Sequence, residues 1–142
     1  MLTRLEITGF KSFGKKTVLH FSSPTTAIVG PNGSGKSNIV EAFRFALGEQ
    51  SMKALRGKKA EDLIWNGSPT SPRANRASVA VAFDNHSRLF PVDFDEVTIE
   101  RTVFRDGESE YAINGSRARL RDVHELLAGA HVGETGHHII SQ

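Results

Sequence analysis

The sequence predicts an α/β fold, and three observations lead to that class. An apolar run at residues 27–29 stops abruptly at Gly30, which is typical of a strand buried on both faces. Between residues 39 and 47 the apolar side chains recur at helical spacing. Three strand-like segments between residues 78 and 114 are separated by tight-turn signals. We therefore expect a strand, a glycine-rich loop and a helix, joined to a mixed or antiparallel β meander.

The composition is that of one ordinary globular domain. The chain has 142 residues, of which 38% are hydrophobic, and a formal net charge of only +2. It contains no cysteine, which excludes disulfides, zinc–thiolate sites and thiol nucleophiles. The first residues carry charges at alternate places, and no apolar stretch approaches the roughly 20 residues that a membrane helix needs. A soluble cytoplasmic protein is the expectation.

The first third of the chain predicts a β-hairpin and then a helix. Apolar residues at positions 2, 5 and 7 alternate with polar neighbours, and residues 17–21 do the same after a Gly-Lys-Lys turn. The helix begins near Lys36, and Gly48 is its expected C-terminal stop. Its apolar residues are Ile39, Val40, Phe43, Ala46 and Leu47.

The rest of the chain predicts a connection, three strands and a second helix. Residues 50–72 should form a structured connection with one short helix at 60–65. Strands are expected at residues 78–84, 97–105 and 110–114, with turns at Asp-Gly and Asn-Gly pairs. A short amphipathic helix should follow, and another strand should start at residue 139. The apolar positions of that helix are Leu120, Val123, Leu126 and Leu127.

One motif in the chain predicts phosphate binding. Residues 30–37 read Gly-Pro-Asn-Gly-Ser-Gly-Lys-Ser and satisfy G-x-x-x-x-G-K-[ST], between a predicted buried strand and a helix. The glycines let backbone N–H groups turn toward phosphate oxygens, and the helix N-terminus adds its positive dipole end. Lys36 should reach the β- and γ-phosphates, and the Ser37 hydroxyl should coordinate Mg²⁺.

This P-loop does not by itself distinguish a kinase, a GTPase and an ATPase. Hydrolysis also needs an acidic Mg²⁺ ligand and a group that positions water. The apolar strand that ends at Asp84 looks like a Walker B element, but Asn85 follows where an ABC-type ATPase would have a catalytic Glu. No Leu-Ser-Gly-Gly signature precedes that strand. We therefore interpret Asp84 as a strand-end turn residue and expect the catalytic half of the site to be absent from this chain.

Several segments resemble the structural maintenance of chromosomes (SMC) family, and most closely its bacterial condensin-like members. They are Ile-Thr-Gly-Phe-Lys-Ser-Phe at residues 7–13, the P-loop with the residue after it at 30–38, Leu-Gly-Glu-Gln at 47–50 and Leu-Arg-Gly-Lys-Lys at 55–59. The similarity continues through residues 61–65, 90–94, 107–111 and 139–142. It covers nearly the whole chain.

The resemblance implies that residues 1–142 are the N-terminal lobe of an ABC-type P-loop ATPase head. Its parts would be a P-loop region at 25–48, an R-loop region at 50–59, the meander at 76–115 and the start of a Q-loop at 139–142. The catalytic residues would then be Lys36, Arg56 and Gln142, with Ser37 and Gln142 on Mg²⁺. The nucleotide would be held by Pro31, Asn32, Gly33, Ser34, Gly35, Lys36, Ser37, Asn38, Lys11 and Ser12.

Two basic clusters could contact nucleic acid through its phosphates. One lies at residues 53–59 and the other contains Arg117, Arg119 and Arg121. Because SMC heads are expected to hold DNA on the upper surface of the engaged dimer, the resemblance favours Lys59, Arg119 and Arg121. Neither cluster is interleaved with aromatic residues, so the contact should be with the backbone of double-stranded DNA, independent of sequence.

The other candidate residues are better explained by structural roles than by metal binding, acid–base catalysis or cofactor binding. His131, His137 and His138 lie in a glycine-rich loop without Asp or Cys at ligand spacing, which argues against a metal site. The acidic residues at 93, 95 and 96 should be turn carboxylates, because no nucleophile is near them. Trp65 and the phenylalanines are expected in the core or at a lobe interface.

The resemblance therefore implies that this chain is the ATP-binding half of a head. The complete head would bind ATP and Mg²⁺, dimerise, and hydrolyse ATP to drive chromosome condensation, segregation and DNA entrapment. The expected partners are the C-terminal lobe of the same protein, a second head in a homodimer, a kleisin-type subunit and DNA, without a membrane. The expected location is the cytoplasm, at the nucleoid. This chain alone should be inactive. A DNA-repair relative with coiled coils, a purely architectural nucleotide-binding domain and a small-molecule kinase are the alternatives.

Overall fold

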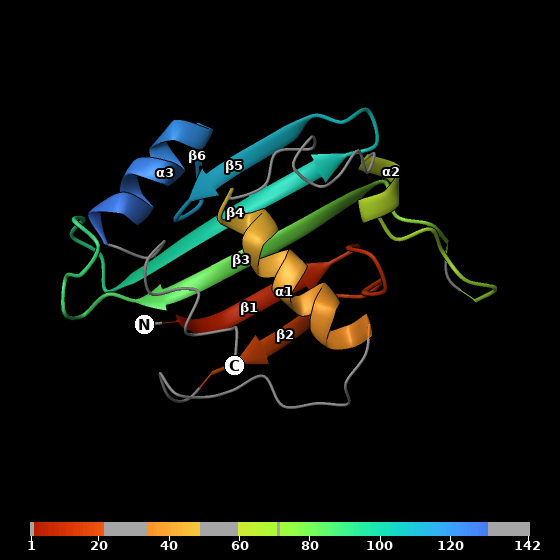
Figure 1. Ribbon diagram of the computed structural model, residues 1–142, viewed down its shortest axis with the longest axis horizontal. Helices are drawn as coiled ribbons and strands as arrows, with labels where there is room; N and C mark the ends of the chain where they lie inside the picture. Colours follow the sequence, from red (N-terminus) through yellow and green to blue (C-terminus); the bar gives the residue numbers. More distant parts are fainter. Residues whose placement is uncertain (1, 22–33, 49–59, 71, 131–142) are drawn as a thin grey trace.

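The computed structural model describes residues 2–21, 34–48, 60–70 and 72–130 (Figure 1). Six strands form a single antiparallel sheet in the order β2-β1-β3-β4-β5-β6. Helix α1 (Ser34–Ala46) lies across one face of this sheet, and α3 (Leu120–Gly129) lies near its β5 and β6 edge. The predicted buried strand at residues 25–29 lies outside the described residues.

The predicted N-terminal hairpin is confirmed. Strands β1 (Leu2–Thr8) and β2 (Thr17–His20) pair antiparallel. Gly9 follows β1 with a φ of +67°, and a Cβ at this position would lie 2.6 Å from the carbonyl oxygen of Arg76. Only glycine fits this close approach of two backbones without a shift.

The predicted meander is also confirmed, with one strand more than expected. Strands β3 (Arg76–Asp84), β4 (Glu96–Phe104) and β5 (Ser109–Ile113) follow one another in the sheet. Asn114 and Gly115 have φ values of 49° and 81°, as a tight hairpin turn requires, and lead into the short strand β6 (Ser116–Ala118). Strand β6 was not predicted, because three residues are too short for an alternating pattern to stand out.

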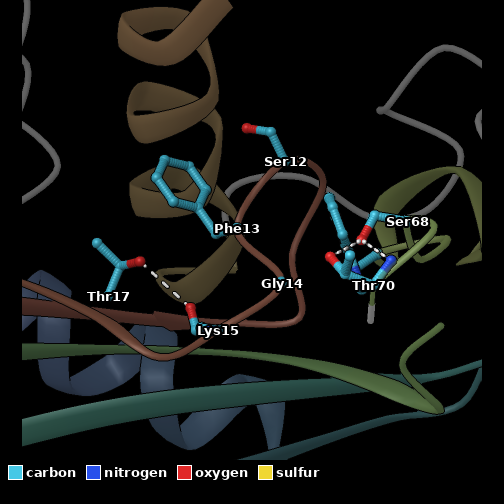
Figure 2. Close-up of a pocket in the computed structure, with 8 residues that line it drawn as sticks. Ser12, Phe13, Gly14, Lys15, Thr17, Ser68 and Thr70 are labelled. Atoms are coloured by element: carbon cyan, nitrogen blue, oxygen red, sulfur yellow. Dashed lines mark hydrogen bonds between the residues drawn. The ribbon is translucent and has the colours of Figure 1, made fainter. Parts of the chain in front are cut away.

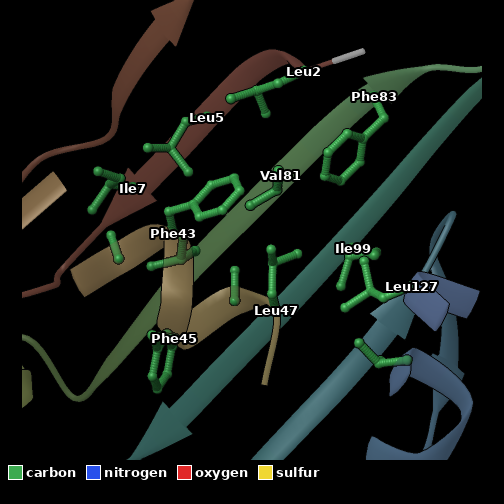
Figure 3. Close-up of a cluster of buried hydrophobic side chains, with 14 of the residues drawn as sticks. Leu2, Leu5, Ile7, Phe43, Phe45, Leu47, Val81, Phe83, Ile99 and Leu127 are labelled. Carbon is green, nitrogen blue, oxygen red and sulfur yellow. The ribbon is translucent and has the colours of Figure 1, made fainter. Parts of the chain in front are cut away.

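The core lies between α1 and the inner face of the sheet (Figure 3). Alternate residues of β1, β3 and β4 point to that face, so that Leu5, Val81 and Ile99 lie opposite one another on neighbouring strands. Helix α1 contributes Ala42, Phe43, Phe45 and Ala46, all of them buried. Of the predicted helix positions, Ile39 and Val40 are only partly buried and pack at the core margin.

Helix α2 (Ala60–Leu63) is shorter than the predicted 60–65. Ile64 leaves the helix to form a β-bridge with Phe10, and the Trp65 N–H donates to the Gly9 carbonyl at 2.8 Å. Pairing with the chain after β1 therefore replaces the last helical turn. In the described residues no helix has the length and apolarity needed to cross a membrane.

Helix α3 confirms the predicted amphipathic helix. Val123, Leu126 and Leu127 are buried, whereas Leu120 at its start is 37% exposed. The Asp122 carboxylate accepts the Arg119 N–H at 2.9 Å and so satisfies a backbone donor at the beginning of the helix.

Candidate functional site

The C-terminal half of the P-loop motif lies in a helix, as the motif predicts. Helix α1 begins at Ser34, so the backbone of the Gly-Lys-Ser segment belongs to its first turn, which holds no acidic residue. The positive end of the helix dipole therefore coincides with the predicted phosphate site. The side chains of Lys36 and Ser37 and the whole of residues 30–33 lie outside the described part of the chain.

The turn formed by residues 9–13 is docked on this helix. The Asn38 Nδ2 donates to Ser12 Oγ at 3.0 Å, and the Lys11 ammonium forms an ion pair with the Glu41 carboxylate. Within the turn, Phe10 and Phe13 exchange two backbone hydrogen bonds, and the Lys11 N–H donates to the Leu63 carbonyl at 2.7 Å. The structure thus places Lys11 and Ser12 against α1, close to Asn38 of that helix; all three are predicted nucleotide-binding residues.

A cavity of about 350 Å³ opens next to this turn (Figure 2). The indole of Trp65 forms part of its wall and packs on Gly14, where a Cβ would lie 2.7 Å from the ring. Arg105 fixes the neighbouring segment by donating to the carbonyls of Trp65 and Ala74. The cavity is lined by Ser12, Phe13, Gly14, Lys15, Thr17, Trp65, Ser68 and Thr70.

The other end of α1 is held by a buried arginine for which the sequence predicted no role. Arg101 is 3% exposed on the inner face of β4, and its Nη1 donates to the Phe45 carbonyl at 3.2 Å. Its guanidinium lies 4.3 Å from the centroid of the Phe45 ring and 5.1 Å from that of Tyr111. Burial lowers the pKa of Arg101 and raises the pKa of Tyr111. The sequence did contain a signal for this role, because Arg101 is a charged residue at an inward-facing position of the predicted strand at 97–105.

Gly48 ends α1 as predicted. Its φ is +70°, and a Cβ would lie 2.6 Å from the Leu120 Cδ1. The Gly48 carbonyl also lies 3.0 Å from the His124 Nε2 of α3. The end of the P-loop helix is therefore fixed by both the meander and α3.

Asp84 lies at the end of β3, where its carboxylate pairs with the His86 imidazole and remains 44% exposed. This hydrogen bond lowers the pKa of Asp84 and raises the pKa of His86.

Asn85 is fully buried and closes the loop to β4. Its Nδ2 donates to the carbonyls of Phe90, Val92 and Phe94, and its Oδ1 accepts the Phe90 N–H. Asn85, the residue that follows β3, thus has a structural role.

Two of the three predicted turn carboxylates lie in this loop, whereas the third, Glu96, is the first residue of β4, and its carboxylate lies 3.4 Å from the Arg4 Nη1. Asp93 and Asp95 each form an ion pair with Arg88 at 3.0 Å. In the described residues no group of three or more His, Asp or Glu side chains is arranged to hold a metal ion.

The predicted DNA-binding and remaining catalytic residues are only partly placed. Arg119 and Arg121 are exposed at the beginning of α3, with Arg119 Nε 3.8 Å from Asp122. Arg117 is 80% exposed and pairs with Glu110 at 3.3 Å. Three further predicted residues, Arg56, Lys59 and Gln142, and the histidines at 131, 137 and 138 lie outside the described residues.

The P-loop sequence, the helix that begins within it and the antiparallel sheet beneath define an α/β lobe of the P-loop class. The chain belongs to the family described as RecF/RecN/SMC N terminal domain, whose model matches residues 1–135.

Relatives named chromosome partition protein Smc confirm the SMC resemblance. The protein from Mycobacterium tuberculosis is 49% identical over 141 residues, and that from Bacillus subtilis is 48% identical over the same length. Each alignment covers 99% of this chain but 12% of the relative. The chain therefore spans about an eighth of the length of these relatives.

Solved SMC heads have the same fold. A structure from work on ATP-driven dimerization and DNA-stimulated activation of SMC ATPases matches with a TM-score of 0.84 and 47% identity, over 92% of this chain and 79% of that chain. A Smc head with an extended coiled coil bound to the C-terminal domain of ScpA, from Pyrococcus furiosus, matches with a TM-score of 0.84 and 49% identity, over 91% of this chain and 33% of that chain. The recombination mediator RecF shares the fold at 23% identity and a TM-score of 0.61, over 87% of this chain and 29% of that chain.

Proposed function

We propose that this chain binds ATP with Mg²⁺ as the N-terminal half of an SMC head, and that the complete head hydrolyses ATP. The observation that carries the proposal is the P-loop motif at the start of α1, with the turn of residues 9–13 docked beside it. A helix N-terminus within a glycine-rich loop is suited to hold a polyphosphate. In the described part of the chain, the strand that resembles a Walker B element ends in Asp84 and Asn85, which organise the β3–β4 loop.

The proposed roles at the phosphates follow the motif. Lys36 neutralises the β- and γ-phosphates, and Ser37 coordinates Mg²⁺. Arg56 of the 50–59 region and Gln142 of the 139–142 region complete the site, with Gln142 as the second protein ligand of the metal. The P-loop region at 25–48 and the meander at 76–115 supply the frame.

The cavity beside the turn has the dimensions for the nucleoside part of the ligand. Its volume of about 350 Å³, the Trp65 ring in its wall and the hydroxyls of Ser68 and Thr70 offer stacking and hydrogen bonding. Because Ser12 lines the cavity and also contacts α1, a nucleotide could bridge the cavity and the helix N-terminus.

The proposed biological role is chromosome condensation and segregation in the bacterial cytoplasm. It is supported by relatives named for chromosome partition, by a related structure described by ATP-driven dimerization and DNA stimulation, and by a related head bound to ScpA. We propose the same partners here: a second head, a kleisin-type subunit, the C-terminal lobe and DNA. Arg119 and Arg121, with Lys59, are the proposed DNA contacts.

Calorimetry on the complete head tests nucleotide binding. Replacement of Lys36 by Ala should abolish measurable ATP binding, because the P-loop lysine supplies the main charge that faces the phosphates. The matched control is Arg88→Ala, which replaces an exposed residue of the β3–β4 loop. This variant should bind ATP as the unaltered protein does. Unchanged affinity of the Lys36 variant would refute the assignment.

A further inference from the structure

We infer that the ion pair between Lys11 and Glu41 is a positioning device for the nucleotide site, so that Lys11 acts through the docked turn and Glu41 is a further residue on which ATP affinity depends. The inference rests on the proposed ATP binding. It assigns a role to Glu41, which lies in the second turn of α1.

The pair is largely enclosed. The Lys11 side chain is 14% exposed and that of Glu41 is 29% exposed. Charges in such a setting are weakly screened, and the loss of one partner leaves the other with an uncompensated desolvation penalty. The pair therefore constrains the geometry more strongly than an ion pair on an open surface does.

The backbone of the turn needs such a constraint. Lys11 has a φ of 51°, in the left-handed region that residues with a Cβ rarely adopt. The Lys11 N–H is bound to the Leu63 carbonyl from one side, and its side chain is bound to Glu41 from the other. An unfavourable backbone conformation persists when its surroundings overdetermine it, and such positions gather at functional sites.

The geometry points the turn at the proposed ligand. Glu41 follows Asn38 by about one turn of α1, so the two side chains lie on the same side of the helix. Glu41 holds Lys11, and Asn38 holds Ser12. Ser12 is thereby placed both against α1 and in the wall of the cavity. If the ion pair breaks, the turn loses an anchor on α1, and Ser12 and the cavity wall move with it.

A charge swap in the complete protein tests this inference. The variants are Lys11→Glu, Glu41→Lys and the double variant, with the thermal midpoint and the affinity for a fluorescent ATP analogue measured for each. Each single variant places two like charges together and should weaken the affinity roughly tenfold. The double variant restores an ion pair and should recover most of the affinity and of the thermal midpoint.

The controls separate the possible failures. The swap of the exposed pair Arg88–Asp93, on the β3–β4 loop, should leave the affinity unchanged, and Glu41→Gln provides a milder single variant if charge reversal prevents folding. Recovery of the midpoint without recovery of the affinity would mean that Lys11 itself contacts the nucleotide, which overturns the inference. Unchanged affinity in Glu41→Lys and Glu41→Gln would also overturn it. Absence of ATP binding by the unaltered protein would instead refute the proposed function.

Discussion

Replacement of Asn85 by Ala should loosen the β3–β4 loop and leave the catalytic chemistry of the complete head intact. The side chain is fully buried and takes part in four hydrogen bonds, three donated to carbonyls and one accepted from the Phe90 N–H. Each bond contributes about 1 kcal/mol net, and a buried group left without a partner costs about 1–3 kcal/mol. Since the Phe94 carbonyl keeps its bond from Arg88, we expect a loss of about 2–4 kcal/mol.

Urea unfolding and ATP hydrolysis measured on the same preparation of the complete protein test this prediction. The matched control is Asp84→Asn, which neutralises the half-exposed carboxylate that pairs with His86 and should change neither the midpoint nor hydrolysis per folded molecule. If Asp84→Asn abolished hydrolysis while Asn85→Ala left the stability unchanged, Asp84 would be a Mg²⁺ ligand and the structural interpretation of this loop would be wrong.

Three further predictions concern other parts of the lobe. Gly48→Ala should destabilise the protein by about 1–2 kcal/mol in chemical unfolding, because the residue has a positive φ and no room for a Cβ; an unchanged midpoint would contradict this. The pKa of His86, followed by NMR, should lie above its ordinary value of about 6.5 and return toward it in Asp84→Asn. Their contact should therefore stabilise the loop most between the ordinary pKa values of Asp and His, weaken below that window as Asp84 is protonated, and weaken above it as His86 loses its proton. Gly14→Ala should displace the Trp65 ring, lower ATP affinity and shift the emission of this single tryptophan; normal affinity would refute the nucleoside cavity.

Local patterns were sufficient to predict the longer helices and strands that the structure describes. The alternation of β3 and β4 and the turn residues Asn114 and Gly115 correspond to the strands and turns that form. Helix α1 ends at Ala46, and the left-handed Gly48 two residues later stops it as the sequence indicates. In each case the signal lies within a few residues of the feature that it predicts.

Contacts between distant segments could not be predicted in the same way. The shortening of α2 depends on Phe10, which lies about fifty residues earlier in the chain. The use of Arg101 to hold the Phe45 carbonyl likewise depends on how α1 lies on the sheet. The pairing of Lys11 with Glu41 joins two segments that no periodicity connects. Side-chain pairing of this kind follows from the packing of the elements, so it becomes visible only in the folded structure.

Reconstitution of the split head tests the central proposal most directly. The chain would be co-expressed with the C-terminal part of its own protein, and ATP hydrolysis would be measured for the pair and for each part, with and without double-stranded DNA. The proposal predicts no hydrolysis by either part alone, and hydrolysis by the pair that DNA stimulates and that Lys36→Ala abolishes. Hydrolysis by this chain alone, or an inactive pair that still binds ATP, would contradict it.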